Sequence, residues 1–375
     1  MKLAITGGGS GGHTLPAITI YEAFKDHYKS ANEDFDSIYI GSHKGIERDV
    51  AIAKQITYFP IATGKLRRYF SLSNLTDLFR ILKGIVDSYF ILRRFKPQVV
   101  FSTGGFVSVP VSIAARIMGI PVVIHEQTSS IGLANKIASY FASKIATSFT
   151  SSIPFFPSHK VVHTGQPIRK ELFTGSKEEC YKLFKLNIKL PIIYVTGGSQ
   201  GSHKINNTVR EIVSDLLKYC NVIHQCGRTQ GHNDFEELQN FRMKLPKNLQ
   251  VRYLLKDFIQ SDELRHILSG SALLIGRAGA GTVNEALALR IPSIFIPLPF
   301  ATRNEQYHNA KILKDLGGAE IIEEKDLEPD LLKERIISLL LDTQRREKMA
   351  KSLESDSKEN ATELLIQLIL EASKS

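Results

Sequence analysis

The chain has 375 residues, of which 43% are hydrophobic and 23% are charged, and this balance is typical of a folded globular protein rather than a disordered one. Its 48 lysines and arginines outnumber its 38 acidic residues, so the formal net charge of +10 indicates an anionic partner such as a nucleic acid, a phosphorylated substrate or an acidic membrane. The three cysteines are too few and too irregularly spaced for a disulfide framework or a zinc site. We expect no signal peptide and no membrane-spanning helix, because no uncharged apolar run reaches about 18 residues.

Four short apolar runs each end in a glycine-rich turn that a helix-compatible stretch follows. In chain order these runs are Lys2–Ile5, Val99–Phe101, Ile192–Val195 and Leu273–Ile275. Further strand-like runs are Ser37–Ile40, Pro121–Ile124, Val222–Ile223 and Ile294–Ile296. Short strands that alternate with helices predict parallel sheets covered by helices on both faces. The predicted fold class is therefore α/β.

The opening glycine turn recurs about halfway along the chain, at Gly197, which predicts two Rossmann-like, doubly wound halves. Residues 163–175 between them are rich in glycine and proline and have the composition of a hinge. We expect one domain over residues 1–164, a second over 165–345, and a C-terminal helical tail over 346–375 that packs back on the domains. Ligands in such folds bind beyond the carboxyl ends of the strands, so two facing sheets would form a shared cleft.

The first turn, Gly7–Gly12, formally satisfies the pattern G-x-G-x-x-G. Glycines permit a tight turn, and the free N–H groups of the following helix attract phosphate. A dinucleotide site would also need an acidic residue at the end of the second strand to bind a ribose. That strand is followed by Gly41-Ser42-His43-Lys44, which contains no carboxylate. The sequence therefore disfavours NAD or FAD, and a purely structural role for one such turn stays open.

The last of the four glycine-rich turns contains a more specific pattern, Arg277-Ala-Gly-Ala-Gly-Thr282-Val-Asn-Glu285. Backbone amides and the Thr282 hydroxyl could hold a diphosphate, and Glu285 could accept hydrogen bonds from both hydroxyls of a ribose. The alternative is that Glu285 only favours the N-terminus of its helix. The two roles are compatible, and the adjacent glycines favour the ligand role.

Six segments in this order and spacing carry a resemblance to a known family: GGGSGGH (7–13), FSTGGFVSVP (101–110), VVIHEQ (122–127), TGGSQGS (196–202), GRAGAGTVNE (276–285) and NEQYHNA (304–310). Over nearly its whole length the chain resembles the MurG family of bacterial transferases. The resemblance implies a GT-B fold and an inverting transfer of N-acetylglucosamine from UDP-N-acetylglucosamine to undecaprenyl-diphospho-N-acetylmuramoyl-pentapeptide (lipid I). The product would be lipid II of peptidoglycan synthesis, made at the cytoplasmic face of the cell membrane with no cofactor and no bound metal.

The resemblance also implies roles for single residues. His13 and Glu126 are its candidates for activating the acceptor hydroxyl. The residues that would contact the donor are Ser10, Gly11, Gly12, Thr128, Arg169, Ser199, Ile259, Thr282, Glu285 and Gln306. Imidazole titrates near neutral pH, so His13 is a reasonable base, and the alternative is a residue that starts a helix and bonds a nearby carbonyl. Helix N-termini and backbone amides would stabilise the departing UDP in place of a metal.

Three positions depart from the family pattern. Thr128 stands where the family commonly has Asn, Glu305 stands for the first of two glutamines, and Phe106 replaces a Tyr. Threonine offers one hydroxyl instead of an amide's paired donor and acceptor, and an ionised glutamate can only accept. The hydrogen bonding at these positions must therefore be arranged differently.

Residues 65–96 combine apolar residues at helical spacing with many basic and aromatic residues. The periodicity over Leu75–Tyr89 alone favours a helix that faces the core. A basic amphipathic segment can also bind anionic lipid, and a lipid-anchored acceptor favours that interpretation. The hypothesis is that Arg67–Phe70 and neighbouring basic residues dock peripherally on the cytoplasmic leaflet.

Other functions stay open on the sequence. One is a GT-B transferase with a different lipid or small-molecule acceptor, and another is a dinucleotide-binding oxidoreductase. A nucleic-acid binder would account for the charge, but the basic residues are dispersed and no recognised nucleic-acid motif accompanies them. We therefore expect UDP-N-acetylglucosamine, lipid I and an anionic membrane surface as partners, and no nucleic acid.

Overall fold

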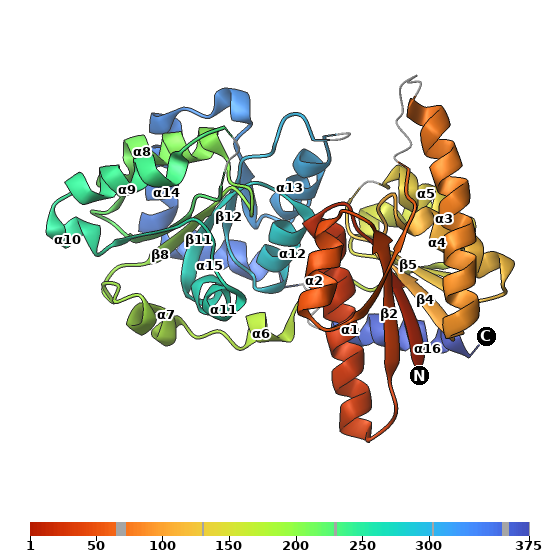
Figure 1. Ribbon diagram of the computed structural model, residues 1–375. Coiled ribbons are helices and arrows are strands. Elements are labelled where there is room, and N and C mark those ends of the chain that lie inside the picture. The colour runs from red at the N-terminus through yellow and green to blue at the C-terminus, as the bar shows by residue number, and fades with distance from the viewer. Residues whose placement is uncertain (65–72, 130, 229–230, 302–303, 355–359, 375) are drawn as a thin grey trace. The chain divides into compact units, whose positions relative to one another are not determined.

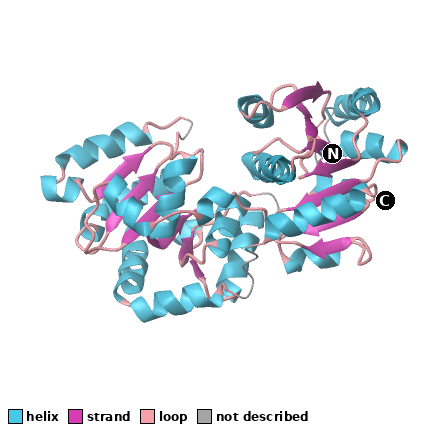
Figure 2. Cartoon of the chain, turned by 90° about the horizontal axis from the view of Figure 1, so that it is seen from below, coloured by secondary structure: helices cyan, strands magenta, loops and turns pink. Residues whose placement is uncertain are grey.

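The computed structural model describes residues 1–64, 73–129, 131–228, 231–301, 304–354 and 360–374. The chain forms two compact units, each with its own parallel sheet: Met1–Ile168 together with Lys358–Ser375, and Arg169–Ser357. Helices cover both faces of each sheet, as the predicted α/β class requires (Figures 1 and 2). The sequence predicts three domains, over residues 1–164, 165–345 and 346–375, and these limits stay a prediction.

The first unit contains a seven-stranded parallel sheet in the order β3-β2-β1-β4-β5-β6-β7. Its strands are β1 (Lys2–Thr6), β2 (Asp36–Ser42), β3 (Thr57–Ile61), β4 (Val99–Ser102), β5 (Val122–Glu126), β6 (Lys144–Thr147) and β7 (Val161–His163). Its helices are α1 (Gly11–Ala31), α2 (Ile46–Ala53), α3 (Ser73–Phe95), α4 (Ser108–Ile117), α5 (Leu133–Ser139), the 3₁₀ helix Thr150–Phe155 and α16 (Ala361–Ser373). The chain leaves the middle strand β1 in one direction and later returns to its other side at β4, which is the doubly wound topology.

Side chains of β1 alternate between two cores, one on each face of the sheet. Leu3 and Ile5 belong to the core that α1 and α16 cover, whereas Ala4 belongs to the core on the side of α4. Both cores are apolar because a parallel sheet is buried on both faces, and this explains the near-continuous hydrophobic run of β1.

The C-terminal helix α16 packs against α1 although more than 300 residues separate them along the chain. Leu365 and Ile369 are fully buried in the same core as Leu3. Figure 1 shows this blue helix among the red and orange elements of the first unit. The end of the chain therefore completes the core of the unit that its beginning builds.

The second unit contains a six-stranded parallel sheet in the order β10-β9-β8-β11-β12-β13. Its strands are β8 (Ile192–Thr196), β9 (Asn221–Gln225), β10 (Tyr253–Lys256), β11 (Ser271–Gly276), β12 (Ser293–Phe295) and β13 (Ala319–Ile321). Its helices are α6 (Lys170–Phe173), α7 (Lys177–Leu183), α8 (His203–Leu216), α9 (Asp234–Lys244), α10 (Lys247–Gln250), α11 (Ser261–Gly270), α12 (Ala280–Ala288), α13 (Glu305–Asp315), the 3₁₀ helix Glu324–Asp326, α14 (Pro329–Leu341) and α15 (Thr343–Ser352). The strand order reverses beside β8, as it does beside β1 in the first unit.

Helix α3 is amphipathic, but the interpretation of its apolar stripe as a core face is wrong for much of its length. Ile81 and Leu92 are buried, whereas five apolar side chains are 48–66% exposed: Leu78, Phe79, Leu82, Val86 and Phe90. The periodicity of a sequence indicates that one face of a helix is apolar, but it does not indicate whether another element covers that face. The predicted docking residues Arg67–Phe70 lie outside the described residues. None of the helices in the described ranges is long and apolar enough to cross a membrane.

The packing of α16 leads to a test of its contribution to stability. We expect Leu365→Ala to lower the free energy of unfolding by about 2–5 kcal/mol, because it removes a fully buried side chain and leaves a cavity. Urea unfolding followed by circular dichroism measures the loss. The matched control is Leu341→Ala, at a side chain that is 68% exposed, for which we expect a change within about 0.5 kcal/mol. Equal effects of the two substitutions would contradict the packing of α16.

Candidate active site

The first glycine loop joins β1 to α1 and leaves the N-terminus of that helix open. The residue before the helix, Ser10, makes no side-chain cap, and the first turn contains no acidic residue. An added Cβ at Gly11 would meet no atom within 4 Å. The predicted residues Ser10, Gly11 and Gly12 therefore form an uncapped helix start whose amides can donate to an anion.

A buried carboxylate holds the same loop from the other side. Glu47, in the first turn of α2, is fully buried, and its Oε2 accepts a hydrogen bond from the Gly9 amide at 3.2 Å. Its Oε1 accepts from the Ser42 amide at 3.1 Å and from the Ser42 hydroxyl at 2.6 Å. A Cβ on Gly8 would lie 2.4 Å from the Glu47 carboxyl carbon, so only glycine fits there. The Gly9 amide is thus already bound and not available for a ligand.

Sequence reasoning missed Glu47 because it looked for an acid directly at the end of the second strand. The glutamate comes five residues after Ser42 and reaches back to the loop from a helix. A signal was present, since an acid in the first turn of a helix that follows a strand of this fold is close to the neighbouring glycine loop. Its burial shows that Glu47 organises the loop and does not bind a ribose.

His13 is held in one orientation and one tautomer. Its Nδ1 lies 2.7 Å from the Thr103 carbonyl oxygen and 3.0 Å from Oε1 of Gln127, and both of these atoms are acceptors. The proton of the neutral ring therefore resides on Nδ1. Among the described residues Nε2 has no hydrogen-bond partner, and the side chain is half-buried. Neutral His13 thus presents a free lone pair on Nε2.

Glu126, the other candidate base, is 2% exposed and fully engaged. Its Oε1 accepts from the amide of Thr128 at 3.1 Å and from its hydroxyl at 2.7 Å. Its Oε2 accepts from Nδ2 of Asn135 at 3.0 Å and from the Gly132 amide at 3.3 Å. This carboxylate fixes the turn after β5. It also accepts the hydrogen bond that the Thr128 hydroxyl donates, so that hydroxyl cannot at the same time donate to a ligand.

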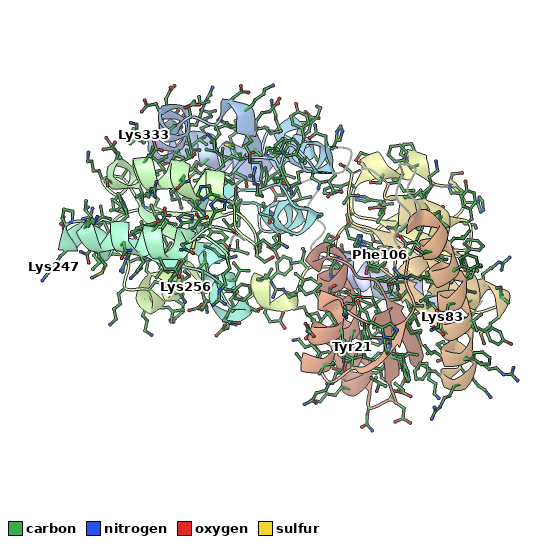
Figure 3. The ribbon with its side chains drawn as sticks, turned by 45° about the horizontal axis from the view of Figure 1, so that its top comes forward. Tyr21, Lys83, Phe106, Lys247, Lys256 and Lys333 are labelled. Atoms are coloured by element: carbon green, nitrogen blue, oxygen red, sulfur yellow. The ribbon has the colours of Figure 1, made fainter. Side chains whose placement is uncertain are left out.

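Phe106, one of the departures from the family pattern, packs its ring against the first glycine loop. A Cβ added to Gly9 would lie 2.5 Å from the ring, and Figure 3 labels this side chain. The contact with the loop is made by the apolar ring, so it does not depend on a hydroxyl.

The second unit contains a cavity of about 550 Å³ at the carboxyl ends of β8 and β11. The loop Gly197–Ser202 forms one wall, and Thr282, Leu298 and Gln306 lie on the others. Helix α12 begins here without a side-chain cap and without an acid in its first turn. The cavity therefore brings together the predicted residues Ser199, Thr282 and Gln306. Its volume is typical of small-molecule sites, and the open N-terminus of α12 can bind an anion there.

Arg277 connects the loops around this cavity. Its guanidinium donates to the Ser202 hydroxyl at 2.8 Å and to the carbonyl oxygen of Ile296 at 3.1 Å, and it forms an ion pair with Glu324. Its side chain is only 11% exposed, so these partners hold it in one position. The sequence places Arg277 in a motif but predicts no role for it. The structure shows that it ties the β8–α8 loop to the end of β12.

Arg169 and Glu285, which are 116 residues apart, approach each other in the second unit. Their closest nitrogen and oxygen atoms are 3.8 Å apart, and Arg169 also donates to the Ser261 hydroxyl at 2.5 Å. Burial raises the pKa of Glu285, and the Arg169 guanidinium opposes that shift. Both side chains are 22% exposed, so a ligand can reach the pair.

The predicted residue Ile259 lies two residues before Ser261. Its side chain is 3% exposed, whereas that of the neighbouring Phe258 is 52% exposed.

Gln306 is oriented by the backbone beside the cavity. Its Oε1 accepts a hydrogen bond from the Leu298 amide at 3.0 Å. With the oxygen fixed in this way, the two N–H donors of the side chain have no partner among the described residues and can serve a ligand hydroxyl.

Two doubly wound parallel sheets, each with glycine turns and an open helix N-terminus at the strand ends, are the GT-B fold. Residues 3–147 match the Glycosyltransferase family 28 N-terminal domain, and residues 192–365 match the C-terminal domain of that family. The UDP-N-acetylglucosamine 2-epimerase from Neisseria meningitidis, solved bound to UDP-GlcNAc, has the same fold, with a TM-score of 0.69, 16% identity and coverage of 99% of this chain and all of that one.

Curated relatives identify the family more closely. The UDP-N-acetylglucosamine–N-acetylmuramyl-(pentapeptide) pyrophosphoryl-undecaprenol N-acetylglucosamine transferase of Clostridium novyi (strain NT) is 39% identical over 98% of both chains. Transferase 2 of that name from Bacillus cereus (strain ATCC 10987) is 38% identical over 99% of both chains. The crystal structure of Acinetobacter baumannii MurG matches with a TM-score of 0.74, at 26% identity over 99% of both chains. This chain belongs to the MurG family of glycosyltransferases.

Two fully buried histidines make the stability of the fold depend on pH. Burial lowers the pKa of His125 to about 4, against a hydrogen bond to the Gly165 carbonyl that raises it, and burial lowers the pKa of His224 to about 3. The unfolded chain binds a proton at each near pH 6.5, so their stabilisation is complete above that pH and is lost as the pH falls toward the folded values. We expect the free energy of unfolding to fall by about 2 kcal/mol per histidine between pH 7 and pH 5.

Urea unfolding at the two pH values measures this loss. His125→Gln should lose about 2 kcal/mol less than the wild type over the interval. The control is His27→Gln, at an exposed histidine of α1, which should keep the wild-type dependence. Equal pH dependence of His125→Gln and the wild type would contradict the assignment.

Proposed function

We propose that this chain transfers N-acetylglucosamine, with inversion, from UDP-N-acetylglucosamine to undecaprenyl-diphospho-N-acetylmuramoyl-pentapeptide, forming lipid II. The observation that carries the proposal is the 39% identity, over 98% of both chains, to a transferase whose name states this reaction. The pocket in the second unit supports a nucleotide-sugar donor, because the open N-terminus of α12 and the neutral side chains of Ser199, Thr282 and Gln306 line it.

The donor is held by the second unit. Its diphosphate binds the amides at the start of α12, with the hydroxyls of Ser199 and Thr282 beside it. The N–H groups of Gln306 donate to sugar hydroxyls, since the carbonyl of that side chain is already bound to Leu298. These contacts need no metal, because the helix N-termini supply the positive potential.

Glu285 and Arg169 hold the ribose end of the donor. Both side chains are partly exposed, and Glu285 needs only its two carboxylate oxygens to accept from two ribose hydroxyls. The segment between β10 and α11 is the proposed uracil site. The exposed ring of Phe258, next to buried Ile259, offers a flat apolar surface there, and the main chain offers amides. The Arg169 guanidinium opposes the rise in the pKa of Glu285 that burial causes.

His13 is the base in this proposal. Its Nε2 removes the proton of the acceptor hydroxyl, and the hydroxyl oxygen forms a bond to the anomeric carbon of the donor sugar. The bond between that carbon and the diphosphate oxygen breaks, and UDP leaves with the electron pair. The free lone pair on Nε2 supports this role, whereas the four hydrogen bonds to Glu126 support a positioning role for that carboxylate.

A transfer assay with radiolabelled UDP-N-acetylglucosamine and a lipid I analogue tests these assignments. We expect His13→Ala to lower kcat by about 10²–10⁴-fold, because the base is lost, while the Kd for UDP stays within about twofold. Glu285→Ala should instead weaken UDP binding by about tenfold or more, since it removes hydrogen bonds to a charged group. Calorimetry measures the Kd values.

The control for both variants is His159→Ala, at an exposed histidine of the first unit, which should retain wild-type rates and affinity. Wild-type protein that binds UDP but transfers nothing to the lipid I analogue would overturn the acceptor assignment and favour another acceptor. Wild-type kcat in His13→Ala would overturn the base assignment alone.

The acceptor has a lipid anchor, so we further propose that α3 binds peripherally to the cytoplasmic face of the membrane. The exposed stripe Phe79, Leu82, Val86 and Phe90 follows one side of the helix at intervals of three or four residues. Exposed Arg80, Lys83, Arg93 and Arg94 flank it, and Figure 3 shows Lys83 projecting from this helix. An apolar stripe between basic residues is the pattern of a helix that lies in the interface of an anionic bilayer.

Vesicle co-sedimentation tests the membrane surface. We expect Phe79→Glu to weaken binding to vesicles that contain anionic lipid by about tenfold or more, because a buried phenyl ring contributes about 1.5–3 kcal/mol. The matched control is Ile188→Glu, at an apolar side chain that is 74% exposed in the second unit, and we expect it to bind like the wild type. Equal binding of both variants would refute docking through α3.

A further inference from the structure

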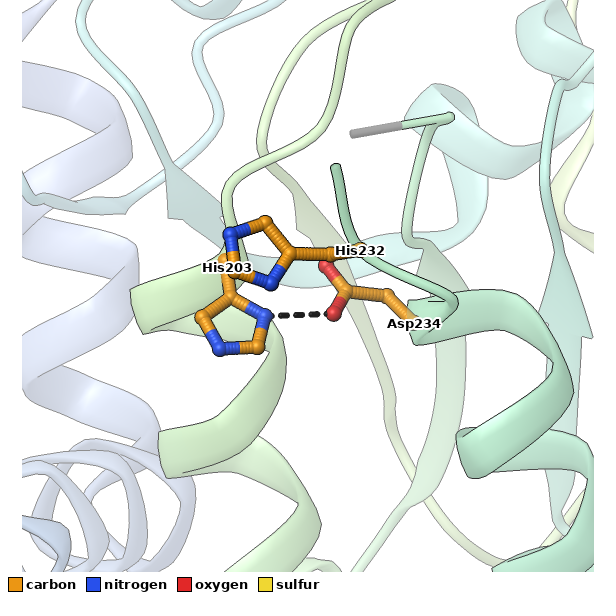
Figure 4. A group of neighbouring side chains, drawn as sticks. All are labelled: His203, His232 and Asp234. Atoms are coloured by element: carbon orange, nitrogen blue, oxygen red, sulfur yellow. Dashed lines mark hydrogen bonds and ion pairs between the residues drawn. The ribbon is translucent and has the colours of Figure 1, made fainter. Parts of the chain in front are cut away.

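Three potential metal ligands lie together at the start of two helices in the second unit. His203 is the first residue of α8, Asp234 is the first residue of α9, and His232 lies in the loop just before Asp234. One potential ligand atom from each lies within 4.8 Å of the other two, and Figure 4 shows the group. No motif in the sequence connects these residues, because 28 positions separate His203 from the other two at their closest, and the cysteine-based patterns of structural zinc sites are absent from the group.

The carboxylate of the group is held in place by a buried network. Asp234 is 3% exposed, and its Oδ1 lies 2.5 Å from Nδ1 of His203. Its Oδ2 accepts from Nδ2 of Asn206 at 2.7 Å, and Oδ1 of Asn206 lies 3.0 Å from Nε2 of His224. Carboxylates that bind metals are fixed by hydrogen bonds of this kind in the surrounding shell.

The His203 ring also has a partner on its far side. Its Nε2 lies 2.8 Å from Nδ2 of Asn207, which at present donates to it while Nδ1 donates to Asp234. A half-turn of the Asn207 amide presents Oδ1 instead, so that Nε2 can hold the ring proton and Nδ1 can offer its lone pair to an ion. The group can therefore change from a hydrogen-bonded to a ligating arrangement with a shift of the ring proton between the two nitrogens.

His232 is the adjustable member of the group. Its ring is exposed and stacks on the His203 ring, with the centroids 3.6 Å apart and the planes at 16°. The lone pairs of two stacked rings lie in nearly parallel planes that do not meet between the rings, so a shared ion requires rotation of one ring. The exposed His232 can rotate without displacing buried atoms, whereas the position of His203 on α8 is fixed by Asp234 and Asn207.

We propose that His203, His232 and Asp234 bind a borderline divalent transition-metal ion such as Zn²⁺. Two imidazole nitrogens and one carboxylate oxygen suit Zn²⁺, Co²⁺ or Ni²⁺, and they are a poor set for Mg²⁺ or Ca²⁺, which prefer oxygen ligands. Three protein ligands leave a position for water, and the exposure of His232 gives the ion a path from solvent. The bound ion would join the N-terminus of α8 to that of α9 at the rim of the cavity that His203 lines.

Cobalt binding to the full-length protein, freed of metal with a chelator and of any histidine tag, tests the site directly. We expect visible absorption bands of Co²⁺ that saturate at one equivalent, and Zn²⁺ should abolish them by displacement. His232→Ala should weaken Co²⁺ binding by about tenfold or more, since even losing a residue that only orients a ligand costs about 10–100-fold. The matched control, His159→Ala, removes an exposed histidine elsewhere and should bind like the wild type.

Thermal unfolding gives a second readout that does not depend on transferase activity. Zn²⁺ that binds only the folded chain should raise the Tm of the wild type and of His159→Ala, while His232→Ala should show at most a small rise and Mg²⁺ should have no effect. Because His232 is exposed, its replacement should leave the Tm in chelator unchanged, which shows that the variant folds. Cobalt affinity equal in the wild type and His232→Ala, or absent from both, would overturn the proposal and leave the group as a hydrogen-bonded pair.

Discussion

Backbone packing at the ends of the central parallel strands constrains both units in the same way. In the second unit Gly276 ends β11 opposite Thr196 at the end of β8, and a Cβ on Gly276 would lie 2.2 Å from the Thr196 carbonyl oxygen. In the first unit a Cβ on Gly7 would lie 1.9 Å from Oγ1 of Thr103. Because no side chain fits between these strands, adjacent strand-to-helix turns stay close together. The proposed ligand contacts depend on that closeness, since helix N-termini act together on an anion only at short range.

The charges around these turns are divided between binding and support. No acidic residue occurs in the first turn of α1, α8 or α12, whereas α2, α9 and α11 each carry acids there. The N-termini of α1 and α12, which also lack a side-chain cap, keep their positive potential for a ligand. The acids that do lie near the loops, Glu47 and Glu126, are buried and accept hydrogen bonds from backbone amides, so each fixes a loop shape.

The same separation appears among the histidines. His125 and His224 are buried, and burial lowers the pKa of each. The ring of His125 on β5 bonds the Gly165 carbonyl, and that of His224 on β9 bonds Asn206 of α8. His13 is half-buried, with one nitrogen bonded and the other without a partner in the described parts of the chain, and such an arrangement suits a general base. His203 is intermediate, since it belongs to a bonded network and also lines the cavity in the second unit. The position of each histidine in the fold therefore decides which of these roles it can perform.

The sequence by itself determined the fold class, the strand-to-helix turns and the family, because these depend on local patterns: apolar runs of strand length, glycines at their ends, and motifs of fixed spacing. It also identified His13, Ser199, Thr282 and Gln306 as candidates, since each belongs to such a motif. Only the tertiary structure decided how these residues are supported. The bond from Glu47 to Gly9, the clamp made by Arg277 and the approach of Arg169 to Glu285 join segments that are distant in the chain. The exposure of the apolar stripe on α3 also depends on the tertiary structure. A periodic pattern specifies that a helix has an apolar face, but only the packing of the other elements determines whether that face is covered.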